Sequence, residues 1–131
     1  MKEYLLINIE HRRGRLNATD IFVCTFVDVE TTDMYNCTVD SSYRNYRNNG
    51  WDRVVHGIAG NSLGLYTGLK RTNRSDREGI PVITADSRPQ QIVALTREEL
   101  VMIIEARQRE IAEQARLADP RNRLFDFDSS K

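Results

Sequence analysis

The chain has 131 residues, of which 40% are hydrophobic and 29% charged, and its formal net charge at neutral pH is zero. This length and composition are typical of one globular domain with a substantial core. No apolar run approaches the roughly 20 residues needed to span a bilayer, and a neutral chain is a poor candidate for a protein that coats DNA indiscriminately. The N-terminal apolar stretch is too short for a secretory signal, so we expect an intracellular, cytoplasmic protein.

The neutral total conceals a separation of charge along the chain. Residues 16–40 contain five acidic side chains and no basic one, whereas residues 41–91 contain eight basic and four acidic side chains. The folded protein could therefore present one acidic and one basic face.

The first strands are predicted close to the N-terminus. Residues 4–9 form a short apolar run rich in strand-forming residues, and the basic segment 11–15 is predicted to end it as a turn. Residues 21–29 are β-branched and aromatic, and they are apolar on both faces for most of their length. This pattern is typical of a strand in the centre of a sheet.

The next elements are a third strand and a short helix. After a turn at 30–33, residues 34–40 alternate and place on one face Tyr35, Cys37 and Val39. Residues 50–60 indicate a short helix, because its apolar residues fall on one stripe: Trp51, Val54, Val55 and Ile58. We expect Trp51 to be an anchor of the core.

Two more strands follow the short helix. A fourth strand is predicted at 65–72, a polar hairpin loop at 73–79 and a fifth strand at 80–85. The glycines in this part of the chain are expected to serve turns and close packing rather than a phosphate-binding loop, because the P-loop pattern of glycines followed by lysine and a helix is missing.

The last element is a long helix. Thr96 and Glu99 form a capping box at its start, Leu95 and Leu100 form the hydrophobic staple around it, and Asp119-Pro120 ends it. Its outer face offers two ion pairs, Glu105–Arg109 and Glu113–Arg116. The helix either covers the sheet or pairs with a copy of itself in a homodimer.

The element order predicts a mainly β, α+β protein. Three strands, a short helix and two strands are the order of a five-stranded OB-like barrel, and a bent antiparallel sheet covered by the C-terminal helix fits almost as well. We expect a single globular domain at 1–118, made of a barrel-like sheet (1–94) and the C-terminal helix (95–118). Residues 119–131 are expected to be a flexible tail.

The sequence offers no catalytic or metal site, and we expect no cofactor. His11 and His56 have no cysteine or carboxylate at ligand spacing, and hydrolase motifs are missing. The acidic residues of 16–40 are expected to form a solvated face rather than an acid/base pair. Cys24 and Cys37 lie in neighbouring predicted strands, where buried free thiols are favoured over a disulfide.

Arginines next to tyrosines point to nucleic acid. Guanidinium groups neutralise phosphates and aromatic rings stack on bases, and three basic clusters would flank one surface in a barrel of this order. The predicted binding residues come from these clusters and their tyrosines: Arg12, Arg13, Arg15, Tyr43, Arg44, Tyr46, Arg47, Tyr66, Lys70, Arg71, Arg74 and Arg77.

These observations predict a non-catalytic nucleic-acid-binding module that prefers single strands, accessory to replication or to a mobile element. The alternative is a protein-interaction module or a small inhibitor, for example a viral one, that binds another protein through its charge-segregated faces. Small-molecule sensing in the barrel mouth is a third option with no specific residue in its favour.

Overall fold

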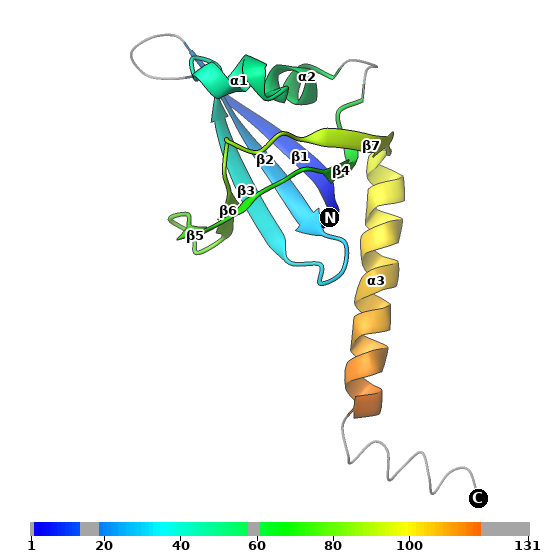
Figure 1. The fold of residues 1–131 in the computed structure, drawn as a ribbon. Coiled ribbons are helices and arrows are strands. Elements are labelled where there is room, and N and C mark those ends of the chain that lie inside the picture. Colours follow the sequence, from blue (N-terminus) through cyan, green and yellow to red (C-terminus); the bar gives the residue numbers. More distant parts are fainter. Residues whose placement is uncertain (1, 14–18, 58–60, 119–131) are drawn as a thin grey trace, which may run out of the picture.

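The computed structural model describes residues 2–13, 19–57 and 61–118, which form a mixed α+β fold with an open seven-stranded sheet and a long C-terminal helix (Figure 1). The strands are β1 (Tyr4–Arg13), β2 (Asp20–Asp28), β3 (Met34–Asp40), β4 (Gly64–Thr67), β5 (Arg71–Ser75), β6 (Pro81–Ile83) and β7 (Gln90–Ala94). The helices are α1 (Arg44–Asn48), α2 (Trp51–His56) and α3 (Arg97–Ala118).

The first three strands form an antiparallel meander, as the sequence predicts. β3 occupies the predicted range, whereas β1 continues to Arg13, which pairs with Asp20 of β2. The prediction of a turn at 11–15 is therefore wrong for its first three residues. Their polar side chains are exposed, so they do not oppose the backbone pairing with β2.

The sheet is strongly curved, because its order places β4 and β5 far apart although only three residues separate them in the chain. The order is β5-β6-β3-β2-β1-β4-β7. In a flat sheet, five strand spacings would separate β4 from β5 by about 24 Å, whereas the chain from Thr67 to Arg71 reaches at most about 14 Å. The sheet therefore curls until the two strands approach, and the chain crosses between them at Gly68, whose φ is 80°.

The described residues form an open seven-stranded sheet, not a closed barrel, so the predicted five-stranded OB-like barrel is not confirmed. The expected fourth strand, 65–72, is divided at Gly68 into β4, which pairs with β1, and β5, which pairs with β6. The expected fifth strand shortens to β6, which runs parallel to β3. β7 is not predicted, because its five residues are all exposed and show no alternation of buried and exposed positions.

Two hydrophobic cores lie on opposite faces of the meander. The larger core contains Trp51, which is fully buried and donates from its indole Nε1 to the carbonyl oxygen of Ala85 at 2.9 Å, so the expected core anchor is confirmed. Trp51 belongs to α2, which lies with α1 across one end of the meander (Figure 1). The smaller core is built on Leu5, Val27 and Leu100.

The cysteine pair lies inside the larger core. Cys24 and Cys37 are directly opposite each other on β2 and β3, and both are fully buried free thiols. Burial raises the pKa of Cys24 to about 12 and also raises that of Cys37, so both thiols are protonated at neutral pH.

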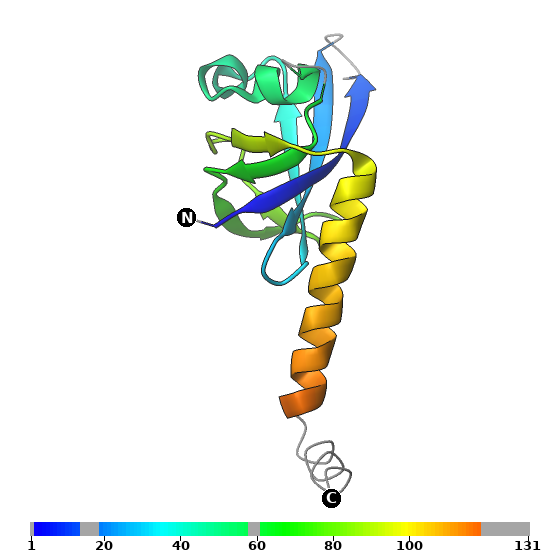
Figure 2. The same ribbon diagram turned by 90° about the vertical axis from the view of Figure 1, so that its right-hand side faces the viewer.

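The helix α3 begins at the predicted capping box. The Thr96 N–H donates to Glu99 Oε1 at 3.0 Å, and the Glu99 N–H donates to Thr96 Oγ1 at 3.1 Å. Leu100 is buried and Ile104 packs beside it on the smaller core, and Arg107 Nε donates to the carbonyl oxygen of Glu30 at 2.8 Å. Beyond this contact the helix extends past the end of the sheet (Figures 1 and 2). In the described part of the chain, no helix is both long and apolar enough to cross a membrane.

Candidate functional site

The face of the meander turned away from the larger core carries a row of polar side chains. Alternation along β2 and β3 buries Cys24, Cys37 and Val39 and therefore directs Thr25, Asn36 and Thr38 to the other face. Thr25 Oγ1 donates to Asn36 Oδ1 at 3.1 Å, which orients the Asn36 amide.

This face is the floor of a hollow of about 530 Å³, which we call the sheet groove. The loop Asp76–Ile80, between β5 and β6, forms part of its wall. The remaining lining comes from the meander: Ile7, Asn8, Glu10, Arg12, Val23, Thr25, Met34, Asn36 and Thr38.

The loop wall of the sheet groove is held in place by Asp76. Asn36 Nδ2 donates to Asp76 Oδ2 at 3.0 Å, and the N–H groups of Glu78 and Ile80 each donate to Asp76 Oδ1 at 2.9 Å. The hydrogen bond from Asn36 and the backbone N–H groups lower the pKa of Asp76 below its ordinary value. The carboxylate is thus ionised at neutral pH and fixes the loop against β3, so the groove is largely preformed.

A second hollow of about 600 Å³, the edge groove, adjoins the first. Tyr43 and Arg74 line it together with Thr38, Thr72, Val82, Ile83, Thr84, Ala85 and Asp86. Thr38 lines both hollows, so the two meet at this residue of β3. The Tyr43 ring is 62% exposed, which leaves it open to a flat ligand.

The charges in the sheet groove nearly cancel. Arg12 binds the Glu10 carboxylate through Nε and Nη2, both at 3.0 Å, and Arg77 shares the wall with Asp76 and Glu78. The hydrogen bond from Arg12 lowers the pKa of Glu10, so this pair stays ionised and neutral as a unit at pH 7.

Three arginines without an ion pair among the described residues lie in the edge groove or next to Tyr43 in the chain. Arg44 and Arg47 are exposed on α1, which follows Tyr43 directly in the chain, and Arg74 is exposed on β5. Within the described residues, no ion pair involves these three arginines or Arg77.

Two of the predicted stacking tyrosines are buried. Tyr46 is 5% exposed and Tyr66 2% exposed, so neither ring offers a face to a base. Tyr46 lies parallel to the Phe22 ring at 6.3 Å, and its hydroxyl is 2.9 Å from His56 Nε2. Burial raises the pKa of both phenols. The prediction is wrong for these rings because α1 and β4 turn them into the core.

Arg71 is also withdrawn from the predicted surface. Its Nη2 forms an ion pair with Asp28 Oδ2 at 2.5 Å, its Nε donates to the Tyr4 hydroxyl at 2.6 Å, and its guanidinium lies 4.6 Å from the centre of the Tyr35 ring. Lys2 Nζ is 2.9 Å from the same carboxylate oxygen. The prediction that Arg71 contacts phosphate is therefore replaced by a structural role that joins β5 to β1 and β2.

Some of the remaining predicted residues line the two grooves and others do not. Arg13 is exposed at the end of β1, and Lys70 is exposed between β4 and β5 but lines neither groove. Arg15 lies outside the described residues, as does the predicted tail 119–131. The structure thus brings together on one surface Arg12, Tyr43, Arg74 and Arg77, with Arg44 and Arg47 next to Tyr43 in the chain.

Both histidines lie against Phe22. His11 stacks on this ring at 4.9 Å and its Nε2 is 2.6 Å from Asp20 Oδ1, while His56 meets the ring edge-on at 5.5 Å. Among the described residues, no three histidine, cysteine or acidic side chains gather as they would around a metal ion. The acidic segment is not wholly solvated as expected, because Asp28 is 1% exposed.

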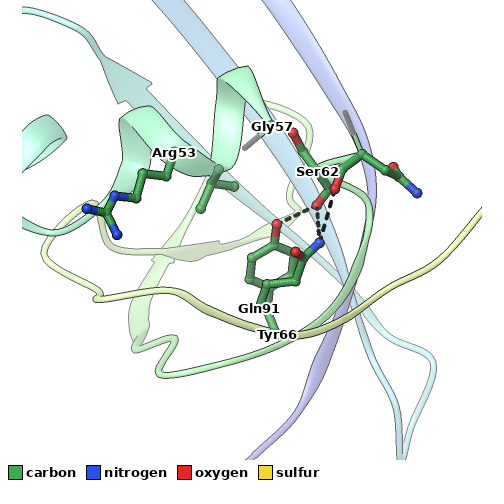
Figure 3. Close-up of a pocket in the computed structure, with 7 residues that line it drawn as sticks. Arg53, Gly57, Ser62, Tyr66 and Gln91 are labelled. Carbon is green, nitrogen blue, oxygen red and sulfur yellow. Dashed lines mark hydrogen bonds between the residues drawn. The ribbon is translucent and has the colours of Figure 1, made fainter. Parts of the chain in front are cut away.

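A third hollow, of about 180 Å³, lies beside α2 (Figure 3). In it the Tyr66 hydroxyl donates to the Ser62 carbonyl oxygen, and Gln91 Nε2 donates to the carbonyl oxygens of Asn61, Ser62 and Leu63 at 3.3–3.4 Å. Arg53 points away from these groups (Figure 3). Tyr66 of β4 and Gln91 of β7 use their polar groups to bind the backbone of residues 61–63. We therefore assign these groups a structural role and do not regard this hollow as a ligand site.

The binding residues predicted from the sequence do not include those that form the polar floor of the sheet groove. Single asparagines and threonines in strands are common and carry no motif, and the groove exists only once the β5–β6 loop has folded over β3. The alternation of 34–40 does identify Asn36 and Thr38 as members of the face opposite the core. Comparisons of the chain with protein-family models, curated proteins and solved structures found no match.

Proposed function

We propose that the chain is a non-catalytic nucleic-acid-binding module that prefers single strands, and that the joined sheet and edge grooves are its binding surface. The observation that supports this most is that the two hollows share Thr38, so the edge groove with Tyr43 and Arg74 adjoins the polar floor of the sheet groove.

The path of the chain supports an OB-like arrangement of this surface. If β4 and β5 are counted as one strand bent at Gly68, then it and β6 bridge the two edges of the meander, and α1 and α2 lie between the third and fourth strands. OB folds bind oligonucleotides across strands 2 and 3, between the loop joining strands 1 and 2 and the loop joining strands 4 and 5. The corresponding face here is the sheet groove, with the Asp76–Ile80 loop as its wall.

The residues on this surface have separate tasks in the proposal. Tyr43 stacks on a base, and Arg44, Arg47, Arg74 and Arg77 contact phosphates, because none of these arginines is held in an ion pair among the described residues. The hydroxyl and amide groups along β2 and β3 hydrogen-bond to base edges. An unpaired strand is favoured because its bases can turn toward the protein.

The number of free arginines sets the expected salt dependence. Four phosphate contacts to a single strand give a slope of about −3 in log affinity against log salt, so affinity falls about 50-fold between about 50 and 200 mM salt. This is a moderate dependence, as expected for a surface that offers four free arginines and also carries carboxylates.

Fluorescence anisotropy with labelled single-stranded and duplex oligonucleotides tests the proposal. We expect tighter binding of the single strand and the salt slope given above. Tyr43→Ala should weaken binding by about 1–3 kcal/mol, which is about 5- to 150-fold, because it removes a stacking surface. Tyr43→Phe keeps the ring and should bind as the parent protein does.

Tyr46→Phe is the matched control, since it alters a tyrosine three residues away whose ring is buried. It should leave affinity unchanged while lowering stability through the lost contact with His56. Binding that is absent at low salt, indifferent to salt, or equal in Tyr43→Ala and the parent protein would contradict the proposal.

A protein-interaction module is the second candidate, and the balanced charges of the sheet groove favour it. Glu10 neutralises Arg12, and Asp76 and Glu78 accompany Arg77, so the groove also suits a polar polypeptide segment. Two results together would favour this candidate over the first. No oligonucleotide would bind at low salt, and the protein would capture a partner protein that the Thr38→Arg variant no longer binds.

A further inference from the structure

After its charged first residues, α3 has a short segment that is apolar around its whole circumference. Residues 100–104 are Leu-Val-Met-Ile-Ile, and five consecutive apolar residues cover every side of a helix. The sheet covers Leu100 and Ile104 but leaves Val101 51%, Met102 68% and Ile103 37% exposed. A helix that is apolar all round is normally buried on all sides, so the side of α3 away from the sheet lacks its cover.

We propose that a second copy of this chain covers that side, with the two α3 helices packed antiparallel about a two-fold axis between Ile103 and Ile104. Met102 lies on the side of α3 opposite the sheet-packed Leu100 and Ile104, and it has the most exposed of the large apolar side chains described. Glu98, Met102, Glu105 and Arg109 follow each other at spacings of four, three and four residues, which places them on one outer stripe. This stripe is the contact surface.

The charges on the stripe select both the partner and the orientation. Glu98 and Arg109 are exposed, and neither forms an ion pair among the described residues. In the antiparallel pair, Glu98 of each copy lies opposite Arg109 of the other, while Met102 packs on the aliphatic stem of Glu105. A parallel pair would instead place like charges together at positions 98, 105 and 109, which is unfavourable.

This inference does not depend on the proposed nucleic-acid binding. No residue of α3 lines the sheet groove or the edge groove, so the contact stripe and the two hollows have no residue in common. A dimer would carry two such surfaces, and two linked binding sites raise the avidity for one long strand.

Sedimentation equilibrium of the full chain at about 1 to 500 μM, a range that spans weak to moderate affinities, tests the proposal. We expect a concentration-dependent rise from the 15.2 kDa monomer toward twice that mass. Met102→Glu should raise the dissociation constant at least about tenfold, because it places two carboxylates in the contact. Gln114→Glu adds the same charge to an exposed position on a different side of α3 and should leave dimerisation unchanged.

A charge exchange tests the register. Glu98→Arg and Arg109→Glu should each raise the dissociation constant at least about tenfold, because each creates two like-charge contacts per dimer. The double variant Glu98→Arg/Arg109→Glu should restore the parent value, since both pairs are again complementary. A monomer throughout the concentration range, a dimer indifferent to Met102→Glu, or a double variant as weak as the single ones would overturn the proposal.

Discussion

The carboxylate of Asp28 remains charged in the interior because several donors reach it. Lys2 and Arg71 pair with Oδ2, and the N–H groups of Glu30 and Thr31 point at Oδ1. Burial alone would raise the pKa of this group, but the hydrogen bonds from Lys2 and from the backbone outweigh it and hold the pKa below its ordinary value. Asp28 therefore ties together the start of β1, the end of β2 and β5.

Removal of this charge should change how stability depends on pH. The pKa of Asp28 is lower in the folded than in the unfolded protein, so its stabilisation is complete above about pH 4 and is lost as pH falls through the folded value. We expect Asp28→Asn to reduce the difference in the free energy of unfolding between about pH 7 and pH 3, measured by urea titration. An unchanged difference would show that Asp28 is not the carboxylate responsible.

The role of Arg71 can be measured in the same way at neutral pH. Arg71→Ala should cost about 3 kcal/mol, because it removes one of the two cations that neutralise a buried carboxylate and also leaves the Tyr4 hydroxyl without its donor. Arg77→Ala is the control, as Arg77 is exposed and has no ion pair in the described part of the chain. Equal stability of the two variants would refute the structural role of Arg71.

At the scale of single residues, the sequence could not separate exposed from buried tyrosines. Tyr43 and Tyr46 stand three residues apart, each followed by an arginine, yet one ring is 62% and the other 5% exposed. Their difference arises because α1 turns Tyr46 toward Phe22 of β2, which is a contact between distant parts of the chain. Trp51 could be assigned to the core, since its neighbours share its helical stripe.

Among the elements, the passage from β4 to β5 decides the shape of the sheet. Gly68 has a φ of 80°, and a Cβ at this position would collide with the carbonyl oxygen of Arg88. The Arg88 N–H donates to the Gly68 carbonyl oxygen at 3.2 Å, so the segment before β7 packs directly on the crossing. Glycine is required here both for its backbone conformation and for the close approach.

Gly68→Ala should therefore destabilise the protein more than a similar change elsewhere. Gly79 is the matched control, because its φ of 82° is nearly the same while a Cβ there would meet no heavy atom within 4 Å. We expect about 1 kcal/mol for Gly79→Ala, from backbone strain alone, and at least about 2 kcal/mol more for Gly68→Ala, measured by urea titration. Similar losses for the two variants would mean that the crossing is not tightly packed.

The crossing from β4 to β5 also shows which elements could be predicted from the sequence. β3 and α3 have strong local patterns, alternation in one and a capping box with helical spacing in the other, and both are found where expected. The expected strand at 65–72 carries a continuous strand pattern, but the curvature of the sheet forces its two halves to different neighbours. β7 has no pattern of its own and forms because β4 offers an unpaired edge.

At the scale of the whole molecule, curvature creates the candidate surface. Because the sheet curls, the β5–β6 loop comes over the face of β3, where Asn36 and Asp76, forty residues apart in the chain, form a hydrogen bond. The basic residues on this surface could be identified from their positions in the sequence, but the polar floor and the withdrawal of Arg71 depend on this long-range folding. The contact stripe of α3 has no residue in common with this surface.

The most direct test of the central proposal is the mapping of backbone amide chemical shifts in the ¹⁵N-labelled protein during titration with a short single-stranded oligonucleotide. We expect the largest changes at residues that line the two grooves: Thr25, Asn36, Thr38, Tyr43 and Arg74. Changes confined to α3, or to the hollow around Ser62 and Gln91, would contradict it.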